Sequence, residues 1–160
     1  MAKIRIGYGY DVHRLVANRK LILGGVVVPH HLGLEGHSDA DVLIHAIIDA
    51  LLGAAALGDI GKHFPDNDPA FKNIDSRILL VKSRELLKGC QFTVSNIDAT
   101  IVAQEPRMLK YIPEMIKNIS NDLGLAKGAI SIKATTGEKI GSMGRGEGIS
   151  ATAVTLIEST

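Results

Sequence analysis

The stretch that decides the fold reads "DADVLIHAIIDALLGAAAL" and occupies residues 39–57. Its apolar residues recur every three to four positions, which predicts an amphipathic helix that ends at Gly58. Ser38 followed by Asp41 matches a capping box and predicts that the helix starts there. Asp41, His45 and Asp49 are spaced four apart and therefore share one face of the helix. The opposite stripe is predicted to pack into the core and contains Ala40, Leu43, Ile44, Ile47 and Leu51.

Strands and further helices surround this helix without a strict β-α-β rhythm. Helical patterns cover residues 75–88 and 106–124, with Pro106 at the start of the second helix, Pro113 bending it and Gly124 at its end. The predicted strands cover residues 3–10, 20–29 (in one or two short pieces), 92–104, 129–136 and 149–158. This order predicts a single α+β domain over residues 1–160. We expect a two-layer sandwich with one mainly mixed β-sheet and helices on one face.

The composition narrows the classes of partner. The chain has 18 basic and 17 acidic residues, a formal net charge of +1 and no tryptophan, which argues against nucleic acid as a partner. No apolar run is long enough to span a bilayer, and residues 1–20 carry no secretory pattern, so no membrane partner is expected. Cys90 is the single cysteine, which excludes an internal disulfide framework. We expect a cytoplasmic protein.

Asp11 and His13, in "GYGYDVHRL" (residues 7–15), form the first candidate pair of metal ligands. Two residues on one face of a strand lie about 6.6 Å apart along the chain, so both can reach one ion. Alone, the pair is more typical of a hydrogen-bonded Asp–His pair at a strand end. His45 adds a third candidate ligand on a carboxylate-flanked helix face. Three protein ligands with an open fourth position are typical of catalytic zinc.

Two further segments carry groups that suit phosphate. His37 and Ser38 precede the predicted helix, whose free N–H groups attract anions, although Ser38 also serves as the predicted cap. The glycine-rich stretch "ATTGEKIGSMGRGEG" (residues 134–148) is the second segment, although its glycines are equally typical of a mobile hairpin. Its hydroxyl, carboxylate and guanidinium groups belong to Thr135, Thr136, Glu138 and Arg145.

Four stretches, in this order and with this spacing, resemble one known family from about Arg5 to Ile157. They are "GYGYDVHRL" (7–15), "GHSDADVLIHAIIDALLGAAALGDIGKHFPD" (36–66), "NIDATIVAQEPRM" (96–108) and "KATTGEKIGSMGRGEGISATAV" (133–154). The chain resembles the 2-C-methyl-D-erythritol 2,4-cyclodiphosphate synthases of the non-mevalonate isoprenoid pathway. The resemblance implies a homotrimer whose sheets face the threefold axis and whose active sites lie between neighbouring subunits.

The resemblance also implies a reaction. The enzyme would convert 4-diphosphocytidyl-2-C-methyl-D-erythritol 2-phosphate to 2-C-methyl-D-erythritol 2,4-cyclodiphosphate and CMP. The 2-phosphate of the substrate attacks the β-phosphate, so no side chain has to act as a nucleophile. Asp11, His13 and His45 would hold Zn²⁺, and Glu138 would help to hold Mg²⁺ or Mn²⁺. His37 and Thr136 would be the catalytic residues that stabilise the transition state.

The substrate-binding residues that the resemblance implies fall into three groups. Around the phosphates and the methylerythritol unit, with residues 59–69 as a lid, they are Asp11, His13, His37, Ser38, Asp59, Ile60, Gly61, Phe64, Pro65, Asp66, Asn67 and Asp68. Around the cytidine they are Ala103, Gln104, Glu105, Pro106, Arg107, Met108, Leu109, Thr135 and Thr136. Further substrate contacts come from Gly137, Glu138, Ser142 and Arg145.

The family has an apolar channel on the threefold axis that can hold an isoprenoid diphosphate. By resemblance, Arg145 and Glu147 form a charged ring near this axis, with Arg145 binding the diphosphate and Tyr10 facing the axis. The chain departs from the family at Ser142, where family members commonly have a Phe that lines the channel, which weakens the expectation of isoprenoid binding. It also has Gly137 where they commonly have a Thr or another polar residue.

Two alternatives remain open on the residues alone. A zinc-dependent phosphohydrolase acting on a related nucleotide diphosphate would use the same three ligands to activate water and would release inorganic phosphate. A non-catalytic trimer stabilised by zinc would need a fourth protein ligand. His30, His31 and His63 are available, but the first two lie far from the motifs and the third lies in the lid segment.

Overall fold

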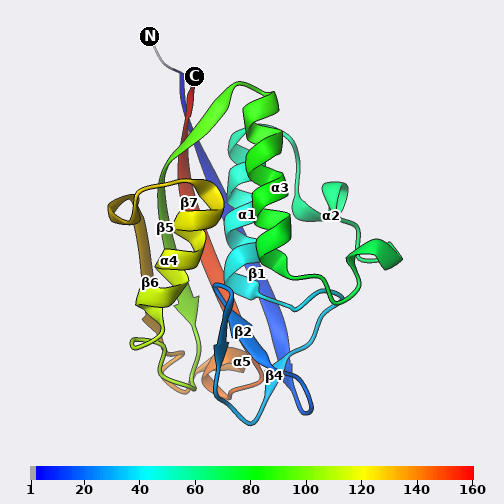
Figure 1. Cartoon of the computed structure of the whole chain (residues 1–160). Coiled ribbons are helices and arrows are strands. Elements are labelled where there is room, and N and C mark those ends of the chain that lie inside the picture. Colours follow the sequence, from blue (N-terminus) through cyan, green and yellow to red (C-terminus); the bar gives the residue numbers. More distant parts are fainter. Residues whose placement is uncertain (1–2) are drawn as a thin grey trace.

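A mixed five-stranded sheet with the strand order β4-β1-β7-β5-β6 forms one layer of the molecule (Figure 1). The structure is a computed structural model that describes residues 3–160. β5 and β6 pair in parallel, whereas β1–β4, β1–β7 and β5–β7 pair antiparallel. The strands in sheet order are β4 (Gly33–Leu34), β1 (Ile4–Val16), β7 (Gly148–Ser159), β5 (Phe92–Val102) and β6 (Ile130–Thr135). A separate hairpin pairs β2 (Leu21–Leu23) with β3 (Val26–Val28).

Three long helices form the second layer, on one face of the sheet (Figure 1). They are α1 (Val42–Ala54), α3 (Ser76–Gly89) and α4 (Ile112–Leu123). The shorter turns are α2 (Ile60–His63), η1 (Pro69–Phe71), η2 (Lys127–Ala129) and α5 (Gly141–Gly144). The predicted α+β class, with one mixed sheet and a helical layer, is confirmed. In the described residues no helix is both long and apolar enough to cross a membrane.

Two glycines let α1 lie against β1 at backbone distance. A Cβ at Gly7 would come within 1.8 Å of the Ala50 carbonyl oxygen, and one at Gly9 within 1.9 Å of the Ala46 carbonyl oxygen. Side chains alternate along a strand, so the next positions on this face of β1 also point toward α1. These positions are Asp11 and His13. The close approach of the two backbones is therefore what brings the candidate ligands of β1 to the helix.

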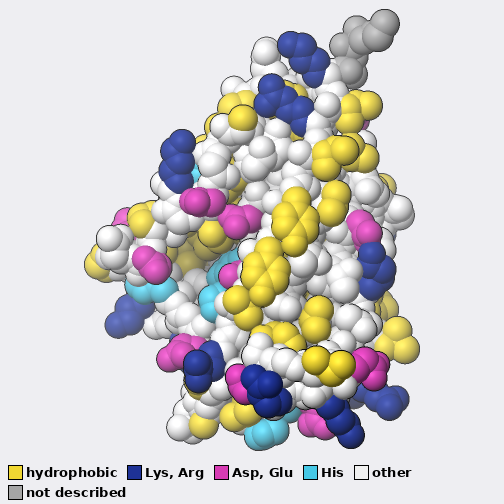
Figure 2. Space-filling model, turned by 180° about the vertical axis from the view of Figure 1, so that it is seen from behind, with side chains coloured by type: hydrophobic (Ala, Val, Ile, Leu, Met, Phe, Trp, Pro, Cys, Tyr) yellow, Lys and Arg dark blue, Asp and Glu magenta, His cyan; other side chains and the backbone are white. Residues whose placement is uncertain are grey.

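The opposite face of β1 is apolar and exposed. Figure 2 shows hydrophobic side chains gathered in a stripe along this side of the sheet. Alternate residues of β1 contribute Ile6 (71% exposed), Tyr8 (65%) and Tyr10 (52%), and Val154 of β7 pairs with Tyr8. An exposed apolar face of this kind is typical of interaction surfaces.

The predicted start and end of the first helix were wrong. Asp41, not Ser38, caps α1, because its carboxylate accepts the Ile44 N–H at 3.1 Å. The helix ends at Ala54, and the following turn places Ala56 in the left-handed region at φ 58°. The N–H of Leu57 then bonds the Leu52 carbonyl at 2.9 Å, a helix ending that does not use Gly58.

The predicted start of the helix over residues 106–124 was also wrong. α4 begins at Ile112, and Pro106 belongs to the segment between β5 and α4. Pro113 lies in the first turn of α4, where its missing N–H leaves no bond unmade, so it starts the helix and does not bend it. Gly124 ends the helix with φ +66°, as predicted.

Candidate active site

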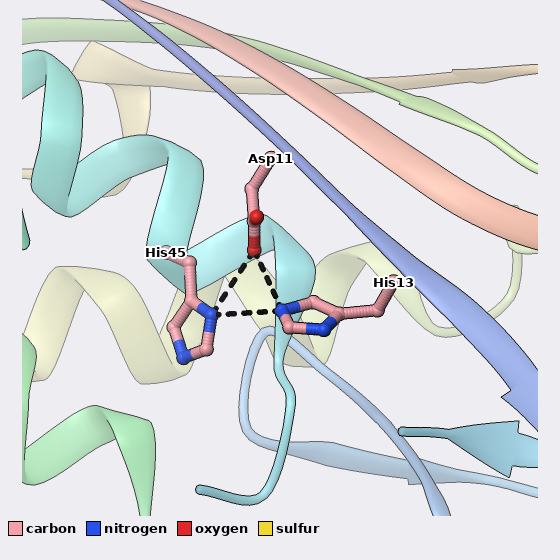
Figure 3. A group of neighbouring side chains, drawn as sticks. All are labelled: Asp11, His13 and His45. Carbon is pink, nitrogen blue, oxygen red and sulfur yellow. Dashed lines mark hydrogen bonds and ion pairs between the residues drawn. The ribbon is translucent and has the colours of Figure 1, made fainter. Parts of the chain in front are cut away.

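Three side chains from β1 and α1 converge on one point (Figure 3). Asp11 Oδ2 lies 2.9 Å from His13 Nε2 and 3.0 Å from His45 Nδ1. The two imidazole nitrogens are 3.2 Å apart. His45 is buried one turn into α1, whereas Asp11 and His13 are partly exposed. The structure therefore brings together all three ligands that the sequence predicts for the metal.

The geometry of this triad fits a divalent metal ion. In a tetrahedral shell with bonds of 2.0–2.1 Å, donor atoms are about 3.3 Å apart, close to the three separations found here. The second nitrogen of each imidazole already has a partner, which leaves the converging nitrogen free to bind. His13 Nδ1–H donates to the Glu35 carbonyl at 2.7 Å, and His45 Nε2–H donates to Ser76 Oγ at 2.8 Å. Within the described residues no other His, Cys, Asp or Glu joins the cluster.

The charges in the triad reinforce one another. Burial alone would raise the pKa of Asp11, but hydrogen bonds and charge from His13 and His45 outweigh burial and lower this pKa to about 2. Burial likewise opposes the charged form of His13, yet the hydrogen bond that His13 donates to the Asp11 carboxylate, and the charge of that carboxylate, raise the pKa of His13. Asp11 is therefore ionised at neutral pH, as a metal ligand has to be.

The two carboxylates that flank His45 in sequence do not support it in space, which corrects the sequence interpretation. Asp41 accepts the N–H groups of Gly24 at 3.0 Å and Gly25 at 2.7 Å, and so fixes the hairpin turn. Asp49 accepts the Ile60 N–H at 2.8 Å, and so fixes the start of α2. His45 Nε2 instead lies 3.2 Å from Ser38 Oγ and, closer still, 2.8 Å from the Oγ of Ser76, on α3. Sequence spacing gave no signal for it, because Ser76 is 31 residues away.

A cavity of about 440 Å³ opens beside the triad. His37 lies on its wall, and its Nε2 is 3.0 Å from the Asp68 carbonyl, which ties the loop after α2 to the cavity. Asp59 and Asp68 do not line the cavity but cap α2 and η1. The lining residues are Asp11, His13, Gly36, His37, Ser38, His45, Asp49, Ile60, Gly61, Phe64, Pro65, Asp66, Asn67, Phe71 and Leu79. Most residues predicted around the phosphates and methylerythritol are therefore gathered here.

A second cavity of about 440 Å³ lies at the ends of β5 and β6. These ends meet because the two strands run parallel, with Val102 opposite Thr135. Glu105 is not part of the cavity wall and instead lines a smaller hollow together with Arg145. The lining residues are Ala103, Gln104, Pro106, Arg107, Met108, Leu109, Ile112, Ile132, Lys133, Ala134, Thr135 and Thr136. Eight of the nine residues predicted around the cytidine thus share one cavity.

The side chains of the glycine-rich turn do not line the cavity beside the triad. Thr136 Oγ1 donates to Glu138 Oε1 at 3.3 Å, and both residues are exposed. Arg145 Nε donates to Glu147 Oε1 at 2.6 Å, also at the surface. Gly137, Glu138 and Ser142 line neither of the two cavities.

Three candidate metal ligands on the wall of a cavity in an α+β sandwich are typical of metal-dependent enzymes. The chain belongs to the YgbB family, whose family model matches residues 4–158. A curated relative from Thiobacillus denitrificans is named 2-C-methyl-D-erythritol 2,4-cyclodiphosphate synthase. It is 59% identical over 158 residues, which cover 99% of each chain. The family resemblance indicated by the four sequence stretches is confirmed.

Two solved structures have the same fold. The bifunctional IspDF from Campylobacter jejuni matches with a TM-score of 0.96 and 41% identity over 100% of this chain, which spans 43% of that longer chain. IspF from Plasmodium falciparum, solved as a CDP complex, matches with a TM-score of 0.86 and 35% identity. That match covers 98% of this chain and 97% of the other.

Proposed function

We propose that this chain converts 4-diphosphocytidyl-2-C-methyl-D-erythritol 2-phosphate to 2-C-methyl-D-erythritol 2,4-cyclodiphosphate and CMP. The ligand triad on the wall of a substrate-sized cavity carries the proposal, in a chain 59% identical to a curated synthase of that name. An oxygen of the 2-phosphate bonds to the β-phosphorus. The bond from that phosphorus to the bridging oxygen breaks, and CMP leaves with the electron pair. The phosphohydrolase alternative has no observation in its favour.

Asp11, His13 and His45 are proposed to hold Zn²⁺, because two imidazoles and one carboxylate suit that ion. When bound, Zn²⁺ would supply Lewis-acid stabilisation to the phosphate oxygens. The chain itself has to align two anionic phosphates and exclude water. His37 and Ser38 lie on the cavity wall and would donate hydrogen bonds to the phosphates. The loop tied to His37 would cover the methylerythritol unit.

Thr136 and Glu138 are proposed to act at the other side of the reacting phosphates. The Glu138 carboxylate is exposed and its only side-chain partner in the described residues is the Thr136 hydroxyl, so it is available to a hard cation such as Mg²⁺ or Mn²⁺. Thr136 also lines the second cavity, where we propose that the cytidine binds. The CDP complex of the Plasmodium falciparum protein supports a cytidine nucleotide as the ligand.

The active site is proposed to form between subunits of a homotrimer. The two cavities share no lining residue, and β7 separates β1, which carries two metal ligands, from β5 and β6. One substrate that needs both cavities is accommodated if a neighbouring chain supplies the second. The exposed apolar face of β1 provides a surface for such assembly (Figure 2). Tyr10, on this face, is proposed to point to the threefold axis.

An isoprenoid site on the axis, a single catalytic domain and a cytoplasmic location are also proposed. The Arg145–Glu147 pair would lie near the axis, where Arg145 could bind the diphosphate of an isoprenoid, although Ser142 removes the aromatic lining there. Both cavities use the same sheet, which supports one catalytic domain over residues 1–160. A cytoplasmic location stays a prediction.

Product analysis tests the proposed function. The chain is incubated with the CDP-methylerythritol phosphate, Zn²⁺ and Mg²⁺, and products are followed by phosphorus NMR. A cyclic diphosphate together with CMP is expected, and His45→Ala should form neither while keeping its fold. Inorganic phosphate with an opened chain would instead establish the phosphohydrolase.

A further inference from the structure

A buried chain of hydrogen bonds lies behind His45, on the side away from the metal ligands. His45 Nε2 is 2.8 Å from Ser76 Oγ, and Ser76 Oγ–H donates to Asp39 Oδ1 at 2.5 Å. Ser76 is fully buried at the first position of α3. Its backbone N–H also donates to Asp39, at Oδ2 and 3.0 Å. The segment before α1 and the start of α3 are thus joined at this point.

The direction of these bonds fixes which nitrogen of His45 carries the hydrogen. A serine hydroxyl has one hydrogen, and a carboxylate can only accept, so the hydrogen of Ser76 belongs to the bond with Asp39. The Ser76 oxygen then presents a lone pair to His45, and Nε2 has to donate. In the neutral imidazole this leaves Nδ1 without hydrogen and directed at Asp11 and His13.

Ser38, the other hydroxyl near His45 Nε2, does not by itself determine whether this nitrogen donates or accepts a hydrogen bond. Its Oγ is 3.2 Å from His45 Nε2 and accepts the Ala40 N–H, but its own hydrogen is not committed to another acceptor in the described residues. It can therefore donate to Nε2 or accept from it. Ser76 differs because the carboxylate behind it fixes its hydrogen.

We infer that Ser76 and Asp39 are positioning residues that hold His45 in the tautomer and orientation that bind the metal through Nδ1. The inference rests on the proposed metal site, but not on the proposed reaction. Hydrogen-bond partners of ligating histidines typically change metal affinity 10–100-fold when they are removed. Ser76→Ala should therefore weaken Zn²⁺ binding by about 10–100-fold. Asp39→Asn should weaken it by a smaller factor, because an amide is a weaker acceptor than a carboxylate.

Zinc affinity, measured on the full chain by competition with a chromophoric chelator, tests the inference. Ser83→Ala is the matched control, because Ser83 is also fully buried on α3 but its hydroxyl bonds the Leu79 carbonyl of its own helix. The control should bind Zn²⁺ like the parent. The visible spectrum of the Co²⁺-loaded protein should change in Ser76→Ala and stay unchanged in Ser83→Ala, which a general loss of stability would not produce.

The outcomes distinguish a failure of the positioning role from a failure of the proposed metal site or of the proposed reaction. Folded Ser76→Ala that binds Zn²⁺ within twofold of the parent would overturn the positioning role. If that variant does not fold, Asp39→Asn decides, and parental affinity and an unchanged Co²⁺ spectrum in that variant overturn the inference. A parent chain that binds no Zn²⁺ would instead refute the metal site. A parent that binds Zn²⁺ but makes no cyclic product would refute only the reaction.

Discussion

Gly9→Ala should separate β1 from α1 and dismantle the metal centre from a distance. The added Cβ would lie 1.9 Å from the Ala46 carbonyl oxygen, whereas ordinary contact begins at 3.4 Å. The obstacle is backbone on both sides, so the strand and the helix have to move apart by about 1.5 Å. Asp11 follows Gly9 on the same strand face, and His45 precedes Ala46. Moving the strand away from the helix therefore lengthens the 3.0 Å distance between Asp11 Oδ2 and His45 Nδ1.

The expected loss is large in both stability and affinity. Overpacking a close-packed interface costs about 1–3 kcal/mol of unfolding free energy. Zinc affinity should fall by more than about 100-fold, because a ligand is displaced and not merely its supporting partner. Urea denaturation of the zinc-free protein and chelator competition measure the two effects separately.

Gly53→Ala is the matched control, since Gly53 lies in the same helix and a Cβ there would meet nothing within 4 Å. Replacing glycine in a helix should stabilise the protein by about 0.5–1 kcal/mol and leave zinc affinity unchanged. If Gly9→Ala and Gly53→Ala both bind Zn²⁺ like the parent, backbone contact does not position the ligands and the reasoning fails.

Three further predictions follow from other parts of the structure. Thr155 is fully buried and its hydroxyl has no partner in the described residues. Thr155→Val should therefore increase the free energy of unfolding by about 1–3 kcal/mol and raise the urea midpoint, whereas a lower midpoint would contradict this. Asp11 raises the pKa of His13 against the effect of burial, so the stability from this pair in the zinc-free protein is fully present between pH 3.8 and pH 6.5 and is lost as the pH rises through the raised pKa of His13. Zinc competes with that proton, so the rise in Tm on adding Zn²⁺ should be larger at pH 8 than at pH 6, and an equal rise would refute the coupling. Tyr8→Lys places a charge on the exposed face of β1 and should give monomers in light scattering with unchanged circular dichroism, whereas an intact trimer would exclude this face from assembly.

Local patterns were enough to predict the metal triad and the helix that carries part of it. The alternation along β1 places Asp11 and His13 on one face, and the helical period of α1 places His45 on the strand side. The family resemblance added the residues at the ends of β5 and β6, whose meeting depends on a parallel pairing that no single segment encodes.

The features that sequence missed depend on contacts between distant segments. Asp41 was read as a neighbour of His45, but it bonds the turn at Gly24 and Gly25. The nearest partner of His45 Nε2 is Ser76 on another helix. The end of α1 was misplaced because Ala56, not a glycine, adopts the left-handed conformation there. In each case, hydrogen bonds in the folded chain overrode a local preference.

The metal cavity of one subunit and the nucleotide cavity of its neighbour are proposed to form one active site. This proposal is tested by co-expressing two differently tagged inactive variants. His45→Ala removes a metal ligand, and Ala134→Trp fills the second cavity from an exposed position on β6. Random mixing in a trimer would give about one quarter of the sites both an intact metal cavity and an intact nucleotide cavity. Each purified mixed trimer holds two copies of one variant and one of the other, so one of its three sites is intact, and mixed trimers should recover about a third of the parental cyclic diphosphate formation. Mixed trimers as inactive as either variant alone would show that each site belongs to one chain, and would contradict the account.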